Sequence, residues 1–226
     1  MAVIAVGAID HDMMVAIAKR WFGKMEGVTA AEHRRPPKRC AGEDFVKIET
    51  QQSYIGVYFT KPRATEKEEL ALGFVEEFLG GGMTSLLHQE VREKRGLVYG
   101  IWSGNDIYYD ANIFTIATST THPAEVVELI IKAIDDFEVL FTEDVFKEYR
   151  EQIINTGTRQ LSKVGRIGGI LAGQWLYDEK MVDPFEHLKK IHSITHKEVL
   201  AAKKKYLDKK SMFVMQLGKE RAVFHI

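Results

Sequence analysis

One stretch, residues 80–100, constrains the fold of this chain more than any other. It reads GGGMTSLLHQEVREKRGLVYG, so three glycines end one helical pattern and a second helical pattern begins at Thr84. Gly96 fits a helix stop, because glycine readily takes a positive φ, and the residues after it begin a strand. We therefore predict a helix-to-strand hairpin, with Arg92 near the helix end and Tyr99 early in the strand.

A hairpin of this length can bring the side chains of Arg92 and Tyr99 over one patch, although they are seven residues apart. An arginine fork and a phenol hydroxyl are suited to hold a peptide carbonyl or a carboxylate. The same pattern also fits a solvated helix end followed by a half-buried strand tyrosine, and the residues alone leave both interpretations open. A phosphate loop is disfavoured, because neither GxGxxG nor GxxxxGK[ST] occurs in the glycine run.

The order of the remaining elements predicts the fold class. Strand patterns are expected at residues 45–50, 53–60, 97–103, 112–118 and 212–217, and helical patterns at 66–79, 123–140, 143–177, 184–192 and 195–207. Two helices open with capping boxes, Thr65 with Glu68 and Thr195 with Glu198. Strand 53–60 is largely apolar on both faces. The order strand–strand–helix–helix–strand–strand–helices indicates an α+β fold, with a mostly antiparallel sheet covered on one face by helices.

Three segments describe the expected domain organisation. Residues 1–22 hold a short apolar strand, 2–7, and a helix capped by Asp10. Residues 23–43 lack periodicity and predict a linker, and residues 44–226 form the main domain. A chain that begins within a strand looks like a piece of a longer protein, so the absence of a signal peptide says little about the compartment. No stretch is apolar over the length that a membrane span needs.

Composition and histidine spacing disfavour several classes of site. The formal net charge of −1 gives no reason to expect binding to nucleic acid or to an anionic membrane. The single cysteine, Cys40, allows no internal disulfide and no cysteine-based zinc site. The zinc motif H-x-x-E-H is absent, and His192 and His196, four residues apart, are separated by a predicted helix break. We therefore predict no metal site in this chain.

The stretch GGGMTSLLHQEVREKRGLVYG resembles the signature of the second half of pitrilysin-family zinc peptidases. These are the inverzincins that include mitochondrial processing peptidase and insulin-degrading enzyme, and weaker similarity extends over essentially the whole chain. The resemblance implies a mitochondrial-processing-peptidase-like half that binds no metal, with zinc held by the other, catalytic half. It also implies that Arg92 and Tyr99 bind the substrate backbone. Two positions depart from the pattern, Leu86 in place of the usual arginine and His88 in place of the usual aromatic residue. Neither position is Arg92 or Tyr99, but the change at Leu86 leaves open how this helix contacts the catalytic half.

The function implied is that of the non-catalytic, substrate-binding half of a zinc metalloendopeptidase. This half would close the chamber, supply Arg92 and Tyr99 to the peptide, contain no catalytic residue and be inactive alone. Residues 1–22 would then close the preceding half. The expected partners are an N-terminal catalytic half or a separate H-x-x-E-H subunit, and a peptide substrate. Without its partner the chain is expected to self-associate through exposed apolar surface. The alternative is a catalytically dead structural or protein-binding subunit of the same fold.

Overall fold

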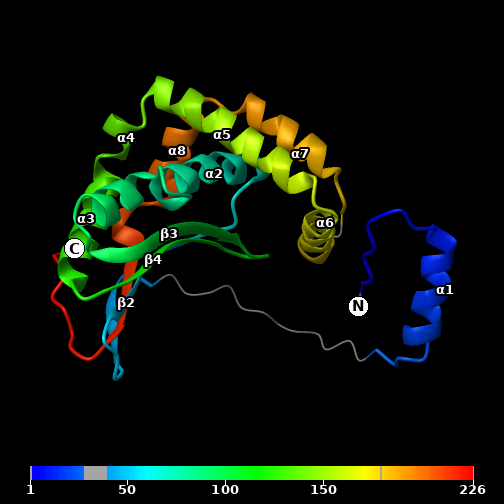
Figure 1. The fold of residues 1–226 in the computed structure, drawn as a ribbon, viewed down its shortest axis with the longest axis horizontal. Helices are drawn as coiled ribbons and strands as arrows, with labels where there is room; N and C mark the ends of the chain where they lie inside the picture. Colours follow the sequence, from blue (N-terminus) through cyan, green and yellow to red (C-terminus); the bar gives the residue numbers. More distant parts are fainter. Residues whose placement is uncertain (1, 28–39, 179, 226) are drawn as a thin grey trace. The chain divides into compact units, whose positions relative to one another are not determined.

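The computed structural model describes residues 2–27, 40–178 and 180–225, which divide into two compact units (Figure 1). We call residues 36–153 and 192–226 the sheet unit, and residues 1–35 and 154–191 the helical unit. Most of the predicted linker, residues 28–39, lies outside the described residues.

The described residues of the sheet unit form a five-stranded sheet in the order β1-β5-β2-β4-β3. Its strands are β1 (Gly42–Lys47), β2 (Ser53–Lys61), β3 (Val98–Ile107), β4 (Asn112–Thr120) and β5 (Met212–Gly218). Neighbouring strands are antiparallel except β1 and β5, which pair in parallel. The predicted α+β fold with a mostly antiparallel sheet is therefore confirmed.

Helices cover one face of this sheet (Figure 1). They are α2 (Glu66–Gly80), α3 (Pro123–Asp135), α4 (Phe137–Leu140), α8 (His196–Tyr206) and the first part of α5 (Glu143–Leu161). A 3₁₀ turn, η3 (Lys209–Ser211), leads from α8 into β5. Both predicted capping boxes are present, at the first turns of α2 and α8. Each satisfies backbone donors that a helix start otherwise leaves without partners.

The core lies between the sheet and these helices. Ile55, Val57 and Phe59 of β2 point into it and are at most 2% exposed. The helices and the segments between them add a cluster of aromatic rings with centroids 5.0 to 6.3 Å apart, made of Phe74, Phe78, Phe137, Phe141, Phe146 and Tyr149. Burying each such side chain contributes about 1.5–3 kcal/mol of transfer free energy.

The opposite face of the sheet is open, in keeping with the prediction that helices cover one face. Tyr54 is 53% exposed and Tyr58 is partly exposed, although the residues between them are buried. Large aromatic residues occupy both faces of β2, and only one face has helices against it.

The described helical unit contains α1 (His11–Phe22), the end of α5, α6 (Val164–Asp178) and α7 (Pro184–Lys190), followed by the 3₁₀ turn η2 (Ile191–Ser193) at the boundary between the units. Asp10 caps α1 as predicted, accepting a hydrogen bond from the Met13 amide at 2.9 Å. The strand expected at residues 2–7 is wrong, because no strand among the described residues pairs with it. No residue of α1 is fully buried.

Two long predicted helices are each divided in the structure. The expected helix over 143–177 is α5 and α6, separated at Ser162 and Lys163, where the Ser162 hydroxyl donates to the Arg159 carbonyl at 2.7 Å. The expected helix over 123–140 is α3 and α4, separated at Asp136. None of the described helices has the length and apolarity that crossing a bilayer requires.

Candidate functional site

The glycine run brings α2 close to β3. A Cβ atom added to Gly80 would lie 2.5 Å from the backbone nitrogen of Ser103, so a larger residue would push the helix away from the strand. The Ser103 hydroxyl also donates to the Glu76 carbonyl at 2.7 Å, which ties the end of α2 to β3. Gly80 therefore acts through close approach, and none of the three glycines has a positive φ.

After the glycines the chain forms η1 (His88–Glu93), a wide π-helical turn where an ordinary helix was predicted from Thr84. Its hydrogen bonds include one from the Lys94 amide to the carbonyl five residues earlier, at 3.0 Å. Such wide turns are rare and often occur at functional sites. The helix stops at Gly96 as predicted, with φ of +65°.

A β-bulge at the start of β3 sets the direction of Tyr99. Val98 pairs with Thr120 and Ile101 pairs with Thr118, so two residues of β3 face a single residue of β4. These two residues are Tyr99 and Gly100. In a regular strand that follows Val98, Tyr99 would face away from the core and Gly100 would face into it. The extra residue lets the strand return to its inward pattern at Ile101, which is 5% exposed, while Tyr99 stays outside.

Two threonine hydroxyls on the covered face hold the bulged segment. Thr118 Oγ1 donates to the Gly100 carbonyl at 2.6 Å, and Thr120 Oγ1 donates to the Leu97 carbonyl at 2.7 Å. These carbonyls would otherwise lose part of their pairing where the ladder is interrupted. The result is a fixed backbone that presents Tyr99 outward, 86% exposed.

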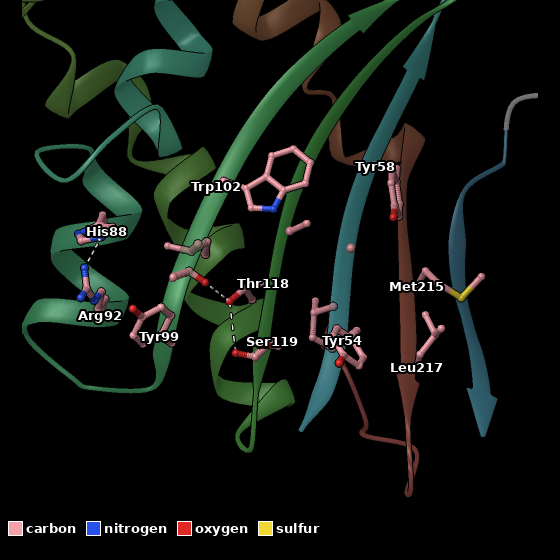
Figure 2. Close-up of a pocket in the computed structure, with 15 residues that line it drawn as sticks. Tyr54, Tyr58, His88, Arg92, Tyr99, Trp102, Thr118, Ser119, Met215 and Leu217 are labelled. Atoms are coloured by element: carbon pink, nitrogen blue, oxygen red, sulfur yellow. Dashed lines mark hydrogen bonds between the residues drawn. The ribbon is translucent and has the colours of Figure 1, made fainter. Parts of the chain in front are cut away.

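The structure brings Arg92 and Tyr99 together on the open face (Figure 2). The guanidinium carbon lies 5.5 Å from the centre of the tyrosine ring, a cation–π contact. Arg92 Nη1 also lies 2.9 Å from His88 Nε2. Because a guanidinium can only donate, His88 Nε2 must accept, and the neutral ring carries its proton on Nδ1.

His88 is a buried support for Arg92. The side chain is 7% exposed, and Nδ1 has no hydrogen-bond partner among the described residues, with Glu93 Oε1 3.8 Å away. The same Glu93 oxygen lies 3.7 Å from Arg92 Nη1, beyond hydrogen-bond distance. Arg92 is thus oriented by a neutral ring and is not tied to a carboxylate by a hydrogen bond.

Neighbouring cations of the hairpin are engaged differently. Lys94 and Arg95 both donate to the carboxylate of Glu90, and these hydrogen bonds, that from Lys94 first, lower the pKa of Glu90. Arg95 also donates to the Glu90 carbonyl at 2.6 Å. Of the three basic residues in this hairpin, Arg92 is the one that lines the open face.

Arg92 and Tyr99 border a cavity of about 660 Å³ on this face. Large apolar or aromatic side chains from three strands line it as well: Tyr54, Tyr58, Trp102, Met215 and Leu217. Sequence reasoning missed these residues as parts of a site. The apolar alternation of strand 53–60 was the signal that could have indicated them, had one face been assigned to solvent.

No group of residues fits a metal ion among those that the structure describes. His192 lies in η2 and His196 in the first turn of α8, so they do not share a helix face. His196 Nε2 donates to the Phe141 carbonyl at 2.6 Å, and Nδ1 lies 3.2 Å from Glu143. These contacts give His196 a structural role.

Comparisons with known proteins show relatives of one kind. A family model described as the peptidase M16 inactive domain matches residues 1–153. An uncharacterized zinc protease from Rickettsia felis is 32% identical over 148 residues, which cover 63% of this chain and 34% of that protein.

Solved structures share the fold at low sequence identity. A protease from Helicobacter pylori superposes with a TM-score of 0.81 at 15% identity, covering 94% of this chain and 53% of that one. A chain of complex III2 from Candida albicans with Inz-5 bound gives 0.75 at 14% identity, covering 93% and 53%. The present chain thus spans about a third of the curated relative and about half of the solved chains.

Proposed function

Because this chain belongs to the peptidase M16 family as an inactive domain, we propose that it is the non-catalytic, substrate-binding half of a zinc metalloendopeptidase. The observation that carries the proposal is the placement of Arg92 and Tyr99 side by side at the edge of one open cavity. In this proposal the half closes a chamber against a catalytic half that carries H-x-x-E-H. Zinc in that other half would supply an activated water, and this chain would contribute binding alone.

The proposed role of Arg92 is to donate hydrogen bonds to a carbonyl of the bound peptide. One guanidinium nitrogen faces His88, which leaves the remaining donors of the fork to reach a ligand. Charge-assisted donors gain most where negative charge develops, so Arg92 would also stabilise the oxyanion that forms when water attacks the carbonyl. The exposed Tyr99 hydroxyl would add a neutral donor beside it.

The organisation of the chain supports the same proposal. Residues 1–22 would close the preceding catalytic half, residues 23–43 would link the halves, and residues 44–226 would form the binding half. Helix α1 supports the first assignment, because Met13, Ile17 and Trp21 are each at least 40% exposed. An amphipathic helix that buries none of its residues is expected to cover its apolar side with another part of the protein.

Reconstitution with the catalytic half tests the proposal. The complex should hydrolyse an unstructured peptide when zinc is present, and each half alone should not. Arg92→Ala should lower kcat/KM by about 10² to 10³, as loss of an oxyanion donor does, and Tyr99→Phe should have a smaller effect in the same direction. The matched control is Arg95→Ala. It removes another cation of the same hairpin, one that donates to the Glu90 carboxylate and does not line the cavity.

Equal activity of the Arg92→Ala and parent complexes would refute the role of the pair. A reconstituted complex without any hydrolysis, but with stable association, would favour the second function, a structural or protein-binding subunit. The likeness of the fold to a chain of complex III2 is the observation that favours this alternative.

A further inference from the structure

The open face holds a trough whose shape is set by two very small residues. Trp102 of β3, Ala117 of β4, Gly56 of β2 and Met215 of β5 stand in one row across the sheet. The two inner positions carry almost no side chain, while the two outer ones are large and apolar. The row is therefore low at its centre, and the cavity lies over it, between these large side chains (Figure 2).

Aromatic rings from β2 also line this low centre, and the Tyr58 ring covers Gly56. Tyr54 and Tyr58 precede and follow Gly56 on the same face of β2. A Cβ atom on Gly56 would collide with the Tyr58 ring, which shows that this ring leans over the glycine. Trp102 leans over Gly104 in the same way, with ring carbon Cζ3 2.9 Å from a Cβ atom built there.

The trough is lined by one positive charge and by no negative one among the described residues. Among the described residues that line it, Arg92 is the only lysine, arginine, aspartate or glutamate. A basic side chain entering the trough would lose water without gaining a counter-ion, and an acidic one would find a cation only at the edge. An apolar side chain would bury its surface against four large neighbours.

We propose that this trough is a subsite for one large apolar side chain, aromatic or branched aliphatic, of an extended peptide. This inference rests on the proposed function, because the peptide is held by its carbonyl at Arg92 while the adjacent side chain enters the trough. Charge complementarity fixes the occupant: the cation faces the polar backbone, and the uncharged aromatic walls face the side chain. The volume of about 660 Å³ is typical of ligand sites.

The test uses the complete enzyme, this chain together with its catalytic half. Peptides of one sequence, varied to Phe, Ala or Lys at each position near the cleaved bond, are compared by kcat/KM. At one position Phe should exceed Ala by roughly tenfold or more, and Lys should be the poorest. Ala117→Leu fills the trough and Trp102→Ala removes one wall, so both should abolish most of the Phe preference while Ala peptides change little.

Val46→Ala is the matched control. Val46 is 45% exposed on β1, pairs with Leu217 in the register and does not line the trough. This truncation should leave the preference unchanged. Binding of the Phe and Ala peptides to the complex without zinc, measured by titration, gives a second readout that needs no catalysis.

The outcomes separate this inference from the proposed function. If Arg92→Ala abolishes activity but Phe and Ala peptides are bound and cleaved alike, the trough is not a subsite and the proposed function stands. The same holds if the preference survives both Ala117→Leu and Trp102→Ala. If Arg92→Ala has no effect but the Phe preference in binding depends on Trp102, the subsite stands and the role of Arg92 falls.

Discussion

The two faces of the sheet are built from the same strands and serve different purposes. On the face covered by helices, Phe59 and Phe114 are fully buried. On the open face, Tyr54 and Trp102 are about half exposed and Tyr99 is 86% exposed. Since successive side chains of a strand point to opposite faces, one short sequence can hold the fold together and present a binding surface.

The open face is unusual because its exposed residues are large and apolar. Exposed apolar surface of this kind marks an interaction site more often than a solvated face. The covered face shows the opposite exception, a half-buried acid. Glu76 of α2 lies close to Glu77 and Asp106, and burial first, then these two charges, raises its pKa to about 7.

Truncating one large side chain on each face should give the largest difference in the free energy of unfolding. Phe114→Ala leaves a cavity in the core and should lower the free energy of unfolding by about 3–5 kcal/mol. Trp102→Ala on the open face should lower it by less than about 1 kcal/mol, as surface substitutions do. Urea denaturation followed by circular dichroism measures both, and a loss at Trp102 equal to that at Phe114 would contradict the division between the faces.

This half-buried acid, Glu76, predicts a dependence of stability on pH. The folded pKa of Glu76, about 7, is above its value of 4.5 in the unfolded chain, so the folded state binds the extra proton between these values. The free energy of unfolding should therefore decrease as pH rises from 4.5 to above 7, by at most about 3 kcal/mol from this group. Glu76→Gln should remove that part of the slope and stabilise the protein at pH 8.

Thermal unfolding at pH 5 and pH 8 checks this prediction. Glu128→Gln is the control, because Glu128 is an exposed acid on α3. An unchanged slope in the Glu76→Gln variant would mean that the carboxyl is already ionised in the folded protein at pH 5, which would contradict the prediction.

Much of the fold follows from local patterns in the sequence. The capping boxes at Thr65 and Thr195, the helix stop at Gly96 and the cap at Asp10 all depend on residues within one or two turns, and the structure has each of them. The strand at 2–7 failed for the complementary reason. Its apolar residues indicate a strand, but a strand forms only where another pairs with it, and local sequence does not supply that partner.

The shape of the candidate site could not be predicted from the same patterns. The spacing of Arg92 and Tyr99 allowed their contact, and the resemblance to pitrilysin-family peptidases indicated it. The bulge in β3 depends on hydrogen bonds from β4, such as that from Thr118 to Gly100, which is eighteen residues away in the sequence. The trough likewise depends on the register that places Gly56 beside Ala117.

The bulge offers the smallest and most specific test of how the covered face supports the open one. Thr118→Val removes the hydroxyl that donates to the Gly100 carbonyl and keeps the shape of the side chain. Loss of one such hydrogen bond should lower the free energy of unfolding by about 1 kcal/mol. Because Tyr99 immediately precedes Gly100, kcat/KM of the complete enzyme should also fall, by about threefold to tenfold. Thr115→Val is the control. It makes the same substitution on the same strand at a position away from the bulge, and it should leave kcat/KM unchanged. If Thr118→Val lowers stability without lowering kcat/KM, the direction of Tyr99 is set by η1 and the turn at Gly96, and the bulge has no part in it.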